Sequence, residues 1–193
     1  MPKLGMEPIR RAALVKATID EIGATGTLDV TVSRIAKRAG VSSALAHHYF
    51  GAKEELFLAA MRHILTLYGD AVKTGLETAK TPHDRLQAVI RAGFEAEQFR
   101  GHVVSAWLNF YVAAQTSASA QRLLTVYQRR LRSNLIHDLR PLVGTRAEVA
   151  AETVAALIDG LYIRAALDPS ASDPSSTAER VLKMLDLMIA EVT

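Results

Sequence analysis

The chain has 193 residues, contains no cysteine and carries a formal net charge of +3. Its length allows one or two domains with a hydrophobic core, and the lack of cysteine excludes disulfide bonds and thiolate metal sites. No signal peptide opens the chain, and no apolar run reaches the ~18 residues that a membrane span needs. We therefore expect a cytoplasmic protein that does not enter a membrane.

The excess positive charge lies in the first third of the chain. Residues 1–63 hold 9 Lys and Arg against 6 Asp and Glu, whereas residues 64–193 hold 14 of each kind. Because phosphate neutralisation supplies most non-specific DNA affinity, this asymmetry favours a polyanionic partner, although an ordinary solvated basic face has the same composition. Residues 1–11 read either as a flexible basic arm that reaches the DNA or as a frayed terminus.

Residues 31–53 predict two short helices joined by a tight turn. The first is capped by Thr31 and has one apolar face, made of Val32, Ile35, Ala36 and Ala39. Gly40 ends this helix because glycine adopts positive φ at little steric cost, and Ser42 caps a second helix over about residues 43–50. The pattern is typical of a DNA-binding helix-turn-helix. The alternative is an ordinary pair of short helices in an all-α protein.

The candidate DNA contacts are side chains at the helix starts and on the outer face of the second helix. Small or polar groups at these places fit a major groove or bind phosphates. They are Thr31, Ser33, Arg34, Ser42, Ser43, Ala44, His47, His48, Tyr49 and Lys53. We assign Lys53 to a phosphate contact and His48 to base recognition. A head that docks on another protein instead of double-stranded DNA is the rival hypothesis.

The segment resembles the TetR family of transcriptional regulators. The resemblance rests on T-V-x-x-I-A-x-x-A-G-V-S, which starts at Thr31, and on H-Y-F-x-x-K-x-x-L, which starts at His48, and it covers about residues 8–60. The family often has Gly and Tyr where this chain has Ala44 and His47. The resemblance implies a DNA-binding regulator that responds to a small molecule.

The rest of the chain predicts further helices rather than strands. We expect helices over about residues 53–80, from Thr81-Pro82 to a break at Gly101, and over about residues 102–115. The next helix runs through residues 124–139 and stops at Pro141. Another runs from a capping box at Thr145 and Glu148 to about Leu167, and the last begins at Pro174. The fold class is therefore all-α. A three-helix DNA-binding head with a helix-turn-helix at residues 1–52 precedes a larger helical ligand-binding and dimerisation domain at residues 53–193.

The last two predicted helices carry much apolar surface. Residues 154–167 are apolar nearly all round, and a wide apolar stripe follows from Val181 to Val192. We predict a homodimer contact through Leu157, Gly160, Leu161, Leu185, Met188 and Ile189, although burial inside a single bundle gives the same pattern. A two-fold dimer reads a near-palindromic operator, with half-sites about one turn (~34 Å) apart or at a related spacing.

Aromatic side chains concentrate in residues 94–111, which hold five of the 11 in the chain. Trp107, Phe110 and Tyr111 share one helix face through their spacing. Converging rings attract a quaternary ammonium group by about 0.5–2 kcal/mol per ring, and a packed aromatic core is the alternative. The candidate ligand residues are Phe94, Glu95, Glu97, Trp107, Phe110, Tyr111, Asp159 and Tyr162.

The acidic candidates would supply a counter-charge to a bound cation. Asp159 stands out because it interrupts an apolar helix, one turn before Tyr162. An ion pair with Arg164 or with Arg130 is the alternative role for this carboxylate.

Three further segments extend the resemblance over the whole chain. These are AWLNFY at residues 106–111, RRLRSNL at residues 129–135 and AALIDGLYIRAAL at residues 155–167, and they resemble choline-responsive repressors of the TetR family. The resemblance implies choline as the ligand and control of the genes that convert choline to glycine betaine. A TetR-type regulator of another cationic or hydrophobic ligand remains the alternative.

Catalytic and metal-binding motifs are missing from the sequence. It has no G-x-S-x-G, no G-x-x-x-x-G-K-[ST], no glycine-rich dinucleotide turn and no H-E-x-x-H. The six histidines lack the helical spacing that a pair of zinc ligands needs. We expect no enzyme activity, no cofactor and no metal site.

Overall fold

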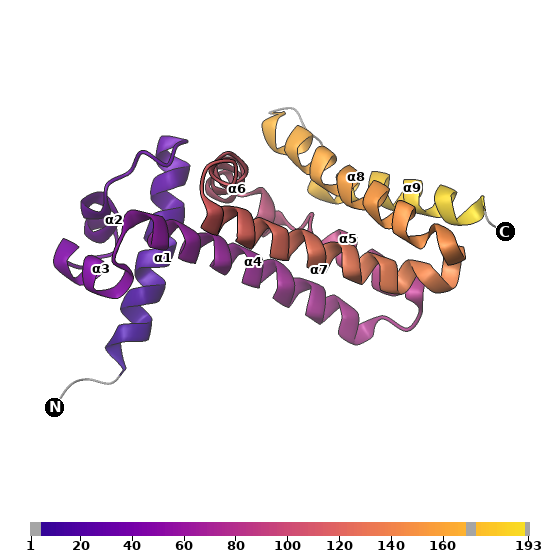
Figure 1. The fold of residues 1–193 in the computed structure, drawn as a ribbon, viewed down its shortest axis with the longest axis horizontal. Helices are drawn as coiled ribbons and strands as arrows, with labels where there is room; N and C mark the ends of the chain where they lie inside the picture. The colour runs from indigo at the N-terminus through magenta and orange to yellow at the C-terminus, as the bar shows by residue number, and fades with distance from the viewer. Residues whose placement is uncertain (1–4, 169–172, 192–193) are drawn as a thin grey trace. The chain divides into compact units, whose positions relative to one another are not determined.

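The computed structural model describes residues 5–168 and 173–191, and the regular structure in these ranges is helical (Figure 1). The chain begins with α1 (Met6–Thr25), α2 (Val32–Arg38) and α3 (Ser43–Phe50). The longer helices are α4 (Lys53–Thr78), α5 (Pro82–Ala92), α6 (Gly101–Ala113), α7 (Ala118–Val143), α8 (Ala147–Leu167) and α9 (Pro174–Ala190). The prediction of an all-α fold is confirmed.

The helices form two compact units, and α4 and α7 contribute to both. The first unit holds the described residues up to Thr66 together with Arg100–Leu124, so it contains α1, α2, α3 and α6. The second unit holds Leu67–Phe99 and the described residues from Thr125 onward, which include α5, α8 and α9. The functional boundary that we predict after residue 52 falls inside the first unit and stays a prediction.

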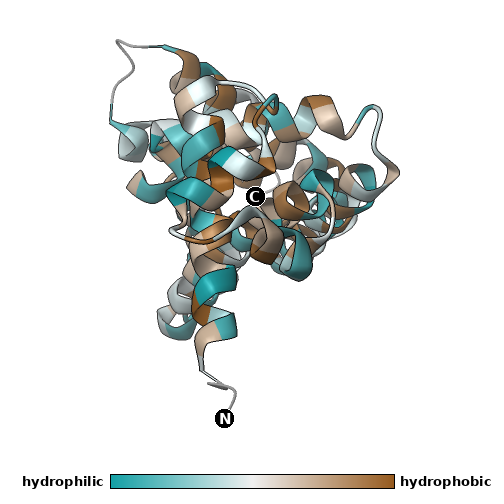
Figure 2. Cartoon of the chain, turned by 90° about the vertical axis from the view of Figure 1, so that its left-hand side faces the viewer, coloured by the Kyte–Doolittle hydropathy of each residue, from teal (hydrophilic) through white to brown (hydrophobic). Residues whose placement is uncertain are grey.

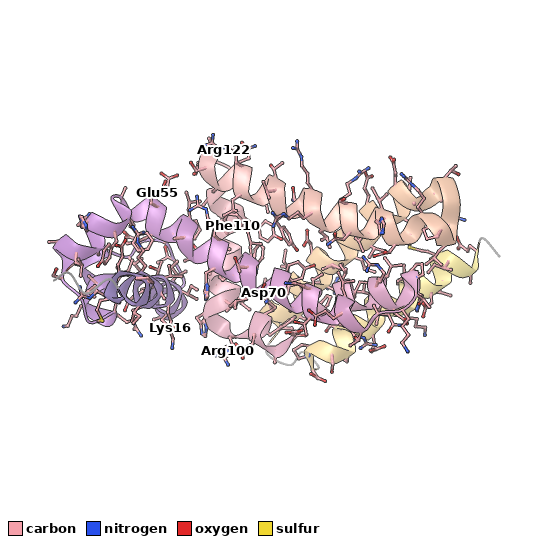
Figure 3. All side chains as sticks on the ribbon, turned by 90° about the horizontal axis from the view of Figure 1, so that it is seen from below. Lys16, Glu55, Asp70, Arg100, Phe110 and Arg122 are labelled. Carbon is pink, nitrogen blue, oxygen red and sulfur yellow. The ribbon has the colours of Figure 1, made fainter. Side chains whose placement is uncertain are left out.

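The core of the first unit is formed by the apolar faces of α1, α2, α4 and α6. α1 packs on α6 and on α2, and α2 packs on α3. Fully buried side chains include Leu14, Ile22, Ile35, Leu56 and Phe110. Figure 2 shows hydrophobic and hydrophilic stretches alternating along the helices, as amphipathic helices require. The side chains labelled in Figure 3 illustrate this division, since Phe110 lies in the interior while Lys16 and Arg122 project outward.

The core of the second unit lies among α5, α7, α8 and α9. α9 packs on both α8 and α5, and Figure 1 shows α8 and α9 side by side. Fully buried side chains include Leu86, Leu135, Leu139, Val154 and Leu185. Within the described ranges, no helix is both long and apolar enough to cross a membrane.

Three expected helix boundaries are wrong. α7 continues through Pro141 to Val143, because Leu139 and Val143 on either side of the proline are both buried and hold the last turn against the core. The capping box at Thr145 and Glu148 does not form, since residues 144–146 make a 3₁₀ turn and α8 starts without a side-chain cap. Gly101 opens α6 rather than breaking the preceding helix, because α5 already ends at Ala92 and a 3₁₀ turn follows at Ala96–Phe99.

Candidate functional site

The two helices of the predicted helix-turn-helix are capped as their sequence requires. The Thr31 hydroxyl oxygen accepts a hydrogen bond from the backbone N–H of Arg34 (3.3 Å), and the Ser42 hydroxyl oxygen accepts one from that of Leu45 (3.2 Å). Gly40 between the helices has a φ of 68°, which a residue with a Cβ atom rarely adopts. The helix-turn-helix geometry is therefore confirmed in the first unit.

The outer face of α3 presents three of the predicted base contacts. Ala44, His47 and His48 are exposed, whereas Ala46 is fully buried. His47 Nδ1 lies 2.8 Å from the carbonyl oxygen of Gly51, so this ring nitrogen donates its proton to the end of the helix. When Nδ1 carries the only ring proton, Nε2 is an acceptor, which suits a base edge with an exocyclic amino group.

The remaining DNA candidates surround the starts of α2, α3 and α4. Thr31, Ser33, Arg34, Ser42 and Lys53 are exposed, and Ser43 and Tyr49 are half-buried. The Lys53 ammonium group donates to the backbone oxygen of Leu28 at 3.2 Å, which holds the side chain beside the loop between α1 and α2. Because an ammonium group has three protons, this contact leaves donors for a phosphate.

The basic side chains of α2 and the buried part of α1 form a charged cluster. Glu21 is 5% exposed. Its carboxylate oxygens lie 2.9 Å from Arg34 Nη2 and 2.5 Å from Arg38 Nε. The hydrogen bond from Arg38, together with the positive charges of Arg34 and Arg38, holds the pKa of Glu21 below its usual range, against the effect of burial. The sequence did not reveal this cluster, because helical periodicity does not indicate which helix faces which.

The proposed N-terminal basic arm is helical from Met6 onward. Residues 1–4, which include Lys3, lie outside the described ranges, and α1 already begins at Met6. The Arg11 guanidinium carbon lies 5.2 Å from the ring centre of Tyr49 and 5.1 Å from that of Phe50. Arg11 therefore attaches α1 to the end of α3 by cation–π contacts and is not part of a flexible arm.

The aromatic face predicted on α6 exists within the first unit. The Trp107 ring centre lies 5.7 Å from that of Phe110 and 5.8 Å from that of Tyr111. Phe110 also meets Phe57 of α4 at 6.2 Å. Phe110 is fully buried and Trp107 is 7% exposed, so both side chains are part of the hydrophobic core, whether or not they also contact a ligand.

A second aromatic group belongs to the second unit. The ring centres of Phe94 and Phe99 lie 6.1 Å apart, and Phe99 meets Tyr162 at 4.9 Å. The Tyr162 hydroxyl donates a hydrogen bond to the backbone oxygen of Gln98 at 2.8 Å, which fixes its ring. Phe94 and Tyr162 are thus brought together through Phe99, which the predicted ligand set omitted.

Asp159 lies near Tyr68, whose ring contacts a second tyrosine, and the spacing of residues along the chain did not indicate this group. The rings of Tyr68 and Tyr127 meet edge to face with centres 5.9 Å apart. Burial raises the pKa of the Tyr68 hydroxyl, and the negative charge of Asp159 raises it further. Tyr127 could have been found by its helical spacing with Leu131, but nothing in the sequence placed Tyr68 of α4 beside an acid of α8.

The other acidic candidates are solvent-exposed. Glu95 lines an open groove of about 700 Å³ between α4 and α5, whose lining also includes Gly75, Ala88 and Arg91. Glu97 is exposed and is not part of that lining. An exposed carboxylate gains little from a monovalent cation in water, so Asp159 is the better counter-charge. Among the described residues, no three His, Asp or Glu side chains are grouped to hold a metal ion.

The predicted dimer residues differ in their access to solvent. Gly160 is exposed, and a Cβ atom added there would have no neighbour within 4 Å. Leu157, Leu161, Met188 and Ile189 are half-buried. Leu185 is fully buried and so belongs to the core of the second unit, where α9 packs on α8 and α5. Met184 and Leu187 are the exposed large apolar residues of α9 within the described ranges.

Comparison with known protein families shows where this arrangement belongs. Residues 14–60 match the model described as bacterial regulatory proteins of the tetR family, and residues 82–190 match the BetI-type transcriptional repressor C-terminal domain. The chain belongs to the TetR family. Its larger domain is of the BetI type, so the resemblance of the sequence to this family is confirmed.

Individual relatives agree with this assignment. The HTH-type transcriptional regulator BetI of Brucella melitensis biotype 2 is 52% identical over 177 residues, which cover 91% of this chain and 89% of the relative. The regulator of the same name from Rhizobium meliloti is 54% identical over 168 residues, which cover 86% and 83%. These relatives regulate transcription and are not enzymes, so this TetR/BetI-type chain is a transcriptional repressor and not an enzyme.

Solved structures share the same fold. A transcriptional regulator from Pseudomonas aeruginosa PAO1 superimposes with a TM-score of 0.85 at 27% identity, covering 97% of this chain and 93% of that one. A regulator from Saccharomonospora viridis in complex with choline superimposes with a TM-score of 0.81 at 20% identity, covering 93% and 97%. At this low identity the second likeness shows the fold alone.

Proposed function

We propose that this TetR-family repressor binds a near-palindromic operator as a homodimer and releases it when choline binds, so that it controls genes converting choline to glycine betaine. The DNA contacts are those of the helix-turn-helix, with Lys53 on a phosphate and His48 on a base edge. The observation that carries the ligand assignment is the Asp159 carboxylate, whose charge acts on the Tyr68 ring in edge contact with Tyr127.

This arrangement has the chemistry that a quaternary ammonium ion requires. Such an ion has no N–H donor, so it is recognised by aromatic faces and by a carboxylate rather than by directed hydrogen bonds. Tyr68, Tyr127 and Asp159 supply both kinds of group in the second unit. The BetI relatives and the choline complex of a protein with the same fold support choline as the cation. The α6 face with Trp107 is a further candidate and is tested separately below.

The proposed response is a population shift between two dimer arrangements. Helix α4 spans Lys53–Thr78 and contributes to both units, so Tyr68 and the proposed phosphate contact Lys53 belong to the same helix. A ligand that favours one orientation of α4 therefore changes how the DNA-binding head is positioned on the operator. Appreciable release of DNA requires choline to prefer the released state by ~1–3 kcal/mol, and operator binding must weaken choline binding by the same factor.

Calorimetry with choline and its neutral isostere tests the ligand assignment. In 3,3-dimethylbutan-1-ol a carbon atom replaces the ammonium nitrogen, so shape is preserved and charge is lost. We expect choline to bind and the alcohol to bind at least tenfold more weakly, because the Asp159 and cation–π contributions vanish. Equal binding of the two compounds would instead indicate a hydrophobic ligand, and tighter binding of a lipophilic cation would indicate another effector.

Titration of choline into the free protein and into its DNA complex tests the coupling. Weaker binding of choline in the complex is the expected result, and equal dissociation constants would refute the response. Salt-dependent binding to a random-sequence duplex tests the head itself. A log-linear decrease with salt is expected for phosphate contacts, whereas a head that docks on a protein gives no such dependence.

A further inference from the structure

We propose that Glu21 of α1 is a positioning residue for DNA binding, which orients Arg34 and Arg38 of α2 toward the phosphate backbone. The inference rests on the proposed function, because it assumes that this head contacts DNA. It adds a residue that makes no DNA contact itself. Its role would be to fix two cationic side chains that otherwise move freely in solvent.

The geometry joins one buried anion to two cations at the surface. The Glu21 side chain is 6% exposed, while those of Arg34 and Arg38 are 57% and 43% exposed. The contacts with Glu21 use Nη2 of Arg34 and Nε of Arg38. Each guanidinium group carries five N–H donors in a planar fork, so donors remain on the solvent side of both groups.

Arg34 is fixed at both ends. Its backbone N–H donates to the hydroxyl oxygen of Thr31 at the start of α2, and its guanidinium group meets Glu21. A free arginine side chain loses up to ~2 kcal/mol of rotamer entropy when it is immobilised on a partner. Because Glu21 restricts the side chain before DNA arrives, less of this entropy is lost on binding.

The charge balance of the cluster also favours a role beyond structure. A buried carboxylate is costly unless it is paired, and one guanidinium group would compensate it. Here two cations contact one anion, so these three groups together carry a net positive charge, while the negative charge of Asp20 also acts on Arg38. This excess charge is available to an anionic partner.

Positioning and simple charge repulsion predict opposite effects of removing the carboxylate. If Glu21 only contributed a negative charge within a Debye length of the DNA, its neutralisation would strengthen binding. If Glu21 orients the two arginines, its neutralisation weakens binding although the protein becomes more positive. The sign of the effect therefore separates the two explanations.

The test measures binding of the full-length protein to a fluorescent random-sequence 30-base-pair duplex as a function of salt. We expect Glu21→Gln to weaken binding about five- to tenfold and to reduce the slope of log K against log salt by about one. The matched control is Asp20→Asn, which removes the same charge one residue away. Asp20 acts on Arg38 only through its charge, so its removal should leave binding unchanged or tighter.

Two further variants sharpen the test, and Glu21→Asp keeps it decisive if Glu21→Gln does not fold. Glu21→Asp keeps the charge and withdraws the carboxylate by one methylene group, so we expect weaker binding here too. In an Arg34→Ala/Arg38→Ala background, Glu21→Gln should have no further weakening effect. Unchanged or tighter binding by folded Glu21→Gln or Glu21→Asp would overturn the inference. Lack of DNA binding by the unaltered protein would instead refute the proposed function.

Discussion

A Cβ atom added to Gly23 of α1 would lie 2.3 Å from the Cβ atom of His102 of α6 and 2.5 Å from its Cα atom. The two helices therefore meet at a point where only glycine leaves enough room. The side-chain amide of Asn109 on α6 adds a hydrogen bond to the backbone oxygen of Gly26 at 3.1 Å. Since α6 also carries Trp107, this contact joins the aromatic face to the helix that holds Glu21.

Gly23→Ala should destabilise the protein. The clash is with backbone atoms of α6, which cannot rotate away, so the helices must separate, at a cost of about 1–3 kcal/mol. Urea denaturation measures this loss. The matched control is Gly69→Ala in α4, where an added Cβ atom has no neighbour within 4 Å, and where we expect a gain of about 0.4–1 kcal/mol. Equal effects of the two substitutions would contradict the close approach of α1 and α6.

Lys53→Ala and His48→Ala should alter DNA binding in different ways. Loss of the Lys53 ammonium group removes one phosphate contact, so binding to all sequences weakens and the salt slope falls by about one. Loss of the His48 ring should change sequence preference instead, because His48 lies on the exposed face of α3. Selection from a random duplex library, followed by salt titration, measures both. Identical profiles would contradict the assigned roles.

Asp84→Asn should reduce stability more at neutral pH than in acid. The Thr81 side chain and the N–H groups of Thr81 and Lys80 hold the pKa of Asp84 below its usual value of 3.8. The stabilisation is therefore complete above the unfolded-state pKa and is lost as the pH falls through the lowered folded-state value. Urea denaturation at about pH 7 and about pH 3 should show the difference between the two proteins shrinking. A difference that is constant with pH would exclude an ionised capping box.

Asp159→Asn should weaken choline binding more strongly than Trp107→Leu. The first change removes the counter-charge and keeps the shape of the side chain. We expect choline affinity to fall about tenfold, which corresponds to about 1.4 kcal/mol of binding free energy. Binding of 3,3-dimethylbutan-1-ol serves as the control, since it should not respond to this charge. If Trp107→Leu abolishes choline binding while Asp159→Asn leaves it intact, the cation site belongs to the α6 face instead.

Leu187→Glu should dissociate the proposed dimer. Leu187 is 51% exposed on α9, so a charge there does not disturb the core of the subunit but would be buried in a dimer contact. Sedimentation equilibrium should show a monomer for this variant. Val126→Glu in α7, at a residue that is 47% exposed, is the control and should remain dimeric. Two variants with the same association state would argue against a dimer contact at Leu187.

Local features of the head were predictable from sequence because neighbouring residues create them. Thr31 and Ser42 accept the expected capping hydrogen bonds, and Gly40 has the expected positive φ. The end of α7 was not predictable in this way. Pro141 normally stops a helix, but here burial of Leu139 and Val143 outweighs that local preference.

The candidate sites depended more on contacts between distant residues. The spacing of Trp107, Phe110 and Tyr111 correctly predicted one shared face, since all three lie on one helix. The neighbours of Asp159 and the arginine partners of Glu21 come from other helices, so no spacing along the chain revealed them.

The sequence alone determined that the chain is helical, where α2 and α3 begin, and that its motifs are those of a TetR-type regulator. These properties follow from backbone preferences and side chains within one or two helical turns. Only the tertiary structure decided that Glu21 pairs with Arg34 and Arg38, that Leu185 is core, and that Gly23 faces His102. Such pairings depend on how whole helices pack, and helix packing is set by many weak contacts between residues far apart in the chain.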